Sequence, residues 1–141
     1  MNQLELEFRR NLLDQMDGLW YHTVHAESPL YPGCPDISYI MIQRGCETGW
    51  LELKAPKPAN QLDVHVESSQ HGWIGKRHDR VPVHFLIDTG RSVCLVNGGH
   101  HAVFAKTIKV ADLECLSDAV LLPHDNWRVL ARALIKATTR R

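Results

Sequence analysis

The stretch YPGCPDISYI, residues 31–40, places an aspartate immediately before a β-strand. Residues 37–42 are rich in isoleucine and predict the strand itself. Proline fixes its own φ and disfavours helix in the residue before it, so Pro35 favours a turn ahead of Asp36. Such an aspartate either bonds its own backbone within the turn or serves a functional site, and the downstream sequence decides between the two.

A second strand, residues 49–55, follows in the segment GWLELKAP. The polar segment 43–48 predicts that this strand and strand 37–42 pair as a hairpin. Alternate side chains of a strand share a face, so Glu52 projects together with the lysine two residues later. The hairpin would also bring Asp36 close to Glu52.

Asp36, Glu52 and the backbone carbonyl of Leu53 would together offer hard oxygen donors. Such donors suit Mg²⁺ or Mn²⁺ with several waters kept on the ion. Without a cation, the two carboxylates would repel each other and raise each other's pKa. Lys54 beside the ion would orient a water or neutralise charge that develops on a phosphate. The pattern therefore indicates metal-dependent chemistry on a phosphate ester.

The pattern PGCPD followed by ELK resembles the PD-(D/E)XK nuclease superfamily, with Asp36, Glu52 and Lys54 at the three signature positions. Residues 66–87, VESSQHGWIGKRHDRVPVHFLI, are similar to the Ser-x-x-Gln-x-x-Trp helix and following strand of the small VRR-NUC branch. The resemblance is strongest over residues 5–97 and extends in function to Holliday junction resolvases.

The resemblance implies a restriction-endonuclease-like core, an α/β fold with a mixed central β-sheet flanked by helices. It implies one nuclease domain over residues 1–141. Apolar residues at helical spacing predict a first helix that ends at Gly18. The other expected elements are a helix over 69–80, strands over 19–25, 83–88 and 92–97, and a basic amphipathic helix within 124–141 capped by Asp125 or Asn126.

The resemblance also implies further site residues. Members of the superfamily often place an acid on the first helix, and Glu7 is the candidate here, with Glu5 as its competitor. Gln70 would face the site from the helix that follows the signature. The implied catalytic set is therefore Glu7, Asp36, Glu52, Lys54 and Gln70, with Glu7 a further candidate metal ligand.

Charge gives a second indication. The chain has 16 basic and 16 acidic residues, so its formal net charge is zero, which argues against a protein coated in base. The bases are gathered locally, however, and some recur at helical spacing near the carboxyl end. A solvated helix face would look the same. The predicted DNA contacts are Lys57, Lys76, Arg77, Arg80, Arg128, Arg132 and Lys136.

Other classes of protein fit the sequence less well. No apolar run reaches the roughly 20 residues of a membrane span, and the charged amino end is no secretory signal, so we expect a cytoplasmic protein without a membrane partner. The four cysteines form no CxxC pair, and the nine histidines lack ligand spacing. The G-x-S-x-G motif of a serine hydrolase is also missing from the sequence.

The sequence thus predicts a structure-selective DNA endonuclease that acts as a homodimer on Holliday junctions or other branched DNA. A two-fold dimer supplies two sites for two symmetry-related strands. Such a compact nuclease would suit a phage or mobile element. The alternatives are a linear-DNA or flap nuclease, the nuclease subunit of a restriction or repair system, and a catalytically silent DNA-binding module. The intact Asp-Glu-Lys set favours an enzyme.

Overall fold

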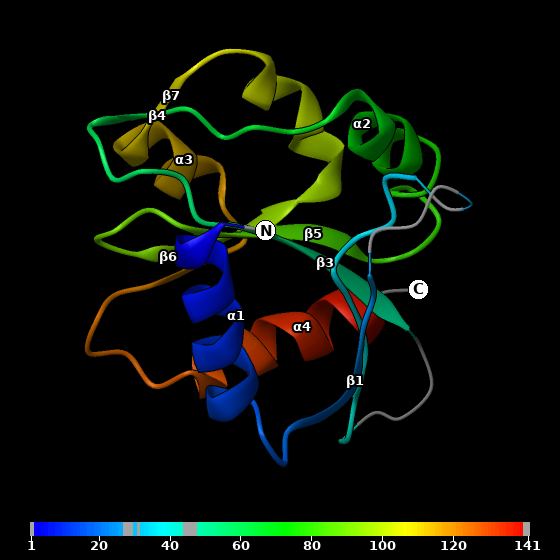
Figure 1. Ribbon diagram of the computed structural model, residues 1–141. Coiled ribbons are helices and arrows are strands. Elements are labelled where there is room, and N and C mark those ends of the chain that lie inside the picture. The colour runs from blue at the N-terminus through cyan, green and yellow to red at the C-terminus, as the bar shows by residue number, and fades with distance from the viewer. Residues whose placement is uncertain (1, 27–29, 31, 44–47, 140–141) are drawn as a thin grey trace.

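The computed structural model describes residues 2–26, 30, 32–43 and 48–139, and its elements are shown in Figure 1. A six-stranded sheet of order β1-β2-β3-β5-β6-β8 has helices on both faces, and β4 and β7 form a separate pair. The elements are α1 (Gln3–Gln15), β1 (Trp20–Val24), β2 (Ile37–Met41), β3 (Gly49–Lys54), β4 (Gln61–Leu62), α2 (Ser68–Gly75), β5 (Val83–Asp88), β6 (Val93–Asn97), the 3₁₀ helix η1 (Gly98–Ala105), β7 (Ile108–Lys109), α3 (Val110–Leu116), β8 (Ala119–Leu121) and α4 (Arg128–Thr139). The expected α/β class, with a mixed sheet between helices, is confirmed.

The register of the sheet sets the position of the two signature acids. β2 and β3 are antiparallel, with Ile37 opposite Leu51, so Asp36 lies beside Glu52 at the next position. The predicted hairpin is confirmed, although residues 44–47 of its connection lie outside the described residues. β3 and β5 are parallel and joined through α2, whereas the other neighbours in this sheet are antiparallel. The crossover places α2 over the face on which Glu52 projects.

α1 and α4 cover one face of the sheet (Figure 1). The side chain of Asn2 caps α1 by accepting a hydrogen bond from the Glu5 amide at 2.9 Å. Phe8 and Leu12 of α1 pack into the same core as Leu130 and Leu134 of α4. The last 40 residues therefore include a helix that completes this core, as the apolar face of the predicted amphipathic helix within 124–141 indicates.

α2, η1 and α3 cover the opposite face (Figure 1). Ile74, Phe85 and Phe104 belong to the core beneath them. α2 ends at Gly75, so the predicted helix over 69–80 is too long. Glycine is a poor helix former. The amides of Arg77 and His78 both donate to the Ile74 carbonyl, which ends the helix in a tight turn. None of the described helices has the length and apolar character needed to cross a membrane.

Candidate functional site

A pocket of about 440 Å³ lies at the carboxyl end of β3, between the first turns of α1 and α2. Asp36, Glu52, Leu53 and Lys54 all line it, together with Gln70 of α2. Leu51 and Leu53 point their side chains into the core of the other face, as strand alternation predicts. The structure thus brings together four of the five predicted catalytic residues, among them the carboxylates Asp36 and Glu52, and leaves out Glu7.

The strand ends fix Asp36 in this pocket. Its Oδ2 accepts a hydrogen bond of 2.8 Å from the backbone amide of Leu53. The bond joins the residue before β2 to the second-to-last residue of β3, across a separation of 17 residues. Asp36 is therefore held by tertiary structure, and not by the local turn that follows Pro35.

Gln70 links the other two signature residues. Its Nε2 donates to Glu52 Oε1 at 3.0 Å, and its Oε1 accepts from Lys54 Nζ at 3.0 Å. The backbone amide of Glu67 donates to the same oxygen at 2.9 Å, which fixes the orientation of the side-chain amide. One amide thereby holds an acid and a base of the pocket at fixed positions.

Glu52 carries a buried carboxyl group whose charge the described residues compensate only in part. The residue is 3% exposed, and its Oε2 is buried without a hydrogen-bond partner among the described residues. Burial raises the pKa of Glu52 far above 4.5, and the negative charge of Asp36 raises it further. The Lys54 ammonium opposes this shift without cancelling it. A buried acid of this kind demands either a proton or a cation.

The pocket fits a hard divalent cation. Two neighbouring carboxylates, one of which has a buried oxygen without a partner among the described residues, are donors that Mg²⁺ or Mn²⁺ accepts, and Leu53 lines the pocket beside them. Within the described residues, no cluster of three or more His, Cys, Asp or Glu side chains is arranged to hold a metal. The fit is therefore to an ion bound through two carboxylates, with water and substrate oxygens in its other positions.

The acid from the first helix is Glu5, and the prediction of Glu7 is wrong in register. Glu5 lines the pocket, where burial raises its pKa; Lys54 opposes the rise and Asp36 adds to it. Glu7 is exposed outside the pocket and accepts a hydrogen bond from Gln3 at 2.9 Å. Phe8 marks the buried side of α1, and a helix turns about 100° per residue. Glu5 therefore lies about 60° from Phe8, whereas Glu7 lies about 100° away on the other side.

The predicted DNA contacts divide between separate surfaces. Arg77 is exposed, places its guanidinium 4.4 Å from the centre of the Trp73 ring, and acts electrostatically on Cys34 in the pocket wall. The bases of α4 belong to the helix on the opposite face of the sheet. None of these bases lines the pocket among the described residues. The exposed members are Lys57, Lys76, Arg77, Arg80, Arg128, Arg132 and Lys136.

Sequence reasoning missed several residues of the pocket wall. Arg9 lies one helical turn after Glu5 and lines the same pocket, so helical spacing from the correct acid would have found it. His25 reaches the pocket from the end of β1, and its Nε2 lies 2.8 Å from Ser38 Oγ. Cys34 adds a half-buried thiol. No motif in the sequence marks His25 or Cys34.

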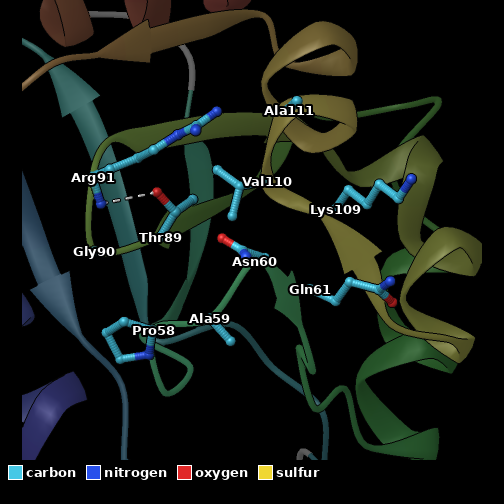
Figure 2. Close-up of a pocket in the computed structure, with 10 residues that line it drawn as sticks. All are labelled: Pro58, Ala59, Asn60, Gln61, Thr89, Gly90, Arg91, Lys109, Val110 and Ala111. Atoms are coloured by element: carbon cyan, nitrogen blue, oxygen red, sulfur yellow. Dashed lines mark hydrogen bonds between the residues drawn. The ribbon is translucent and has the colours of Figure 1, made fainter.

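A larger hollow, about 680 Å³, lies elsewhere and is shown in Figure 2. Several of its polar groups are already engaged: Arg91 forms an ion pair with Glu114, and Thr89 Oγ1 accepts from the Arg91 amide. Thr89 also bonds Ser92. Unlike the smaller pocket, this hollow contains no unpartnered buried side-chain atom among the described residues. Its volume alone does not make it a site.

The loop before Asp36 depends on a glycine. Gly33 has a φ of 81°, and a Cβ there would lie 2.0 Å from the Ser69 carbonyl oxygen of α2. We expect Gly33→Ala to lower the free energy of unfolding by about 1–3 kcal/mol, through left-handed backbone strain and this clash. Urea unfolding would measure the loss. Gly72→Ala is the matched control, because that Cβ would meet nothing within 4 Å and helix propensity favours alanine. Equal stability of the Gly33 variant and the parent would contradict the close packing of Gly33 against the Ser69 carbonyl.

Comparison of the chain with protein-family models, curated proteins and solved structures finds no match. Any functional conclusion must therefore be drawn from the geometry of the pocket.

Proposed function

We propose that this protein is a metal-dependent, structure-selective DNA endonuclease with a restriction-endonuclease-like core of the PD-(D/E)XK type. The observation that carries the proposal is Glu52 Oε2, a buried carboxylate oxygen that lacks a partner among the described residues and lies beside the acid Asp36. A silent DNA-binding module gains nothing from this arrangement, since an apolar residue would avoid its cost. A site that binds a cation does need it.

Asp36, Glu52 and the Leu53 carbonyl would hold Mg²⁺ or Mn²⁺. When bound, the ion supplies Lewis-acid polarisation of the phosphate and lowers the pKa of a water. The protein contributes a pocket in which Asp36 already accepts a hydrogen bond from the Leu53 amide. The carboxylates therefore need little reorganisation when the substrate arrives.

Lys54 supplies the positive charge of the site. Gln70 holds its ammonium through a 3.0 Å bond, so the side chain is restrained rather than freely mobile. Its proposed role is to stabilise charge that grows on the phosphate in the transition state or to orient the attacking water. Glu5 and Arg9 line the pocket from α1, where they would position water and the DNA backbone respectively.

The distribution of bases supports a branched DNA substrate. Non-specific affinity for straight duplex DNA comes mainly from the neutralisation of phosphates by Lys and Arg. A protein of zero net charge therefore binds straight duplex weakly. Exposed bases lie after α2 on one side of the sheet and along α4 on the other. DNA arms that diverge would contact both groups at once. A homodimer would present each group twice, and two sites suit two symmetry-related strands.

Cleavage assays test this proposal directly. We expect Mg²⁺- or Mn²⁺-dependent nicking of a labelled four-way junction, loss of nicking in EDTA, and tighter binding to the junction than to duplex of equal length. Flap, duplex and single-stranded DNA of matched length complete the panel. Paired nicks near the crossover would identify a resolvase, whereas preferential flap or end cleavage would identify the alternative nuclease. Absence of cleavage with either metal would overturn the enzyme proposal.

A further inference from the structure

The two edges of the six-stranded sheet are protected unequally. β8 has three residues, and an aspartate and a proline flank it closely, features that discourage pairing with another chain. β1 at the other edge has five residues, WYHTV, with no lysine, acid or proline. Four of the five are exposed, including Tyr21 at 68% and Val24 at 40%. In the described part of the chain, β1 pairs with β2 alone.

The hydrogen bonds of β1 determine which backbone groups remain for a partner. The amide of His25 donates to the Asp36 carbonyl, and the Leu19 carbonyl accepts from Ile42, so odd-numbered residues bond inward to β2. In an antiparallel ladder, alternate residues bond to opposite neighbours. The outward N–H and C=O groups therefore belong to Trp20, His22 and Val24.

This pattern is self-complementary. If two copies of β1 meet antiparallel with His22 opposite itself, Trp20 lies opposite Val24 of the partner, and each outward donor meets an outward acceptor. A two-fold centre on Tyr21 or Thr23 would also set outward groups against outward groups, but it would pair only two residues of β1 in each copy instead of three, so the centre on His22 gives the longest ladder. No charges oppose each other at this edge, and the chain's net charge is zero, so electrostatic repulsion is small.

We infer that β1 is a self-association surface, on which a second copy of this chain pairs antiparallel about His22. The two-fold axis would be perpendicular to the sheet, so both copies present the same face. Because the two copies run antiparallel, the candidate pockets, each at the carboxyl end of β3, would lie at opposite ends of one continuous sheet and offer one site to each of two symmetry-related strands. That functional meaning rests on the proposed nuclease activity, whereas the association itself does not. Pairing of one short strand buries little area, so we expect a reversible dimer that gains population with concentration.

Cross-linking and solution mass test the inference without any activity measurement. Cysteines at position 22 would face each other with Cα atoms about 5.5 Å apart, within disulfide range. His22→Cys should give a covalent dimer on mild oxidation. Val24→Cys, exposed on the same strand, should not cross-link beyond the parent, because its partner cysteine would lie several residues away along the strand. The parent controls for the native cysteines.

Light scattering after size exclusion provides the second readout. The parent should shift from monomer towards dimer as concentration rises, and His22→Lys, which sets two ammonium groups opposite each other, should remain monomeric. Gln15→Lys adds the same charge on exposed α1 and should dimerise like the parent. A parent that stays monomeric at every concentration, a dimer indifferent to His22→Lys, or equal cross-linking at positions 22 and 24 would each overturn the inference. A dimer without nuclease activity would uphold it and reject only the proposed function.

Discussion

Replacing Asp36 with asparagine or Glu52 with glutamine should reduce DNA cleavage by at least about 10²-fold, because even residues behind a metal ligand cost about 10–100-fold when changed. Each substitution removes one negative charge and keeps the side-chain shape. The side-chain oxygen of the asparagine can still accept from the Leu53 amide, and that of the glutamine can still accept from Gln70. The fold should therefore survive. Single-turnover cleavage of a labelled junction in Mg²⁺ measures the loss, and circular dichroism checks the fold.

Two helix variants provide the matched comparison. Glu5→Gln changes an acid in the pocket wall and should slow cleavage, whereas Glu7→Gln changes an exposed acid two residues away and should cleave like the parent. Binding of the junction in a gel shift should be retained by the Asp36 and Glu52 variants, which separates lost chemistry from lost affinity. Full activity in both of those variants would place the active site elsewhere.

The central hairpin could be predicted because strand geometry leaves little freedom. Once residues 37–42 and 49–55 are paired with a short connection, alternation decides which side chains share a face, and the register sets Asp36 beside Glu52. The hairpin prediction depends on short-range periodicity alone. Gln70 is expected only from the resemblance of its segment to a family helix, and the parallel β3–β5 crossover explains why that helix lies over the face that carries Glu52.

The helix acid shows where such reasoning fails. Glu5 and Glu7 both fit a pattern that asks only for an acid on the first helix, and the choice depends on helix phase relative to Phe8. Leu4 continues the apolar spacing of α1, but it is 45% exposed, so it gives a false indication of the buried face of the helix. Its exposure reflects where the helix begins relative to the sheet, which is set by tertiary packing. The helix phase defined by the two buried positions, Phe8 and Leu12, places Glu5 nearer the buried side than Glu7.

The remaining differences have the same origin. η1, β7, α3 and β8 are short elements whose boundaries depend on contacts with β4 and β6 more than on their own propensity. The pocket also draws His25 from the end of β1 and Cys34 from a loop. Neither side chain belongs to a spaced motif, so only the folded chain brings them together.

Removal of divalent cations should make the stability of the protein fall as pH rises, because of Glu52. Its pKa in the folded state is raised far above 4.5 by burial and then by Asp36, whereas the unfolded chain returns it towards 4.5. Above pH 4.5 the folded state therefore keeps a proton that the unfolded state releases. Its contribution to stability is complete below the unfolded pKa and is lost as pH rises towards the folded pKa. The free energy of unfolding therefore falls by up to about 1.4 kcal/mol per pH unit.

Thermal melts in EDTA between about pH 5.5 and 8.5 would measure this effect, since the window lies above the unfolded pKa of the carboxyl group. The parent should lose stability across that range relative to Glu52→Gln, in which the titrating group is gone while the other ionisable groups remain. Glu7→Gln should follow the parent, since it removes an exposed acid outside the pocket. Mg²⁺ should raise the melting temperature of the parent most at the alkaline end, where displacing the Glu52 proton costs least, and should leave Glu52→Gln little changed. Parallel pH profiles for the parent and Glu52→Gln, together with an equal response to Mg²⁺, would show that Glu52 neither holds the proton nor binds the cation.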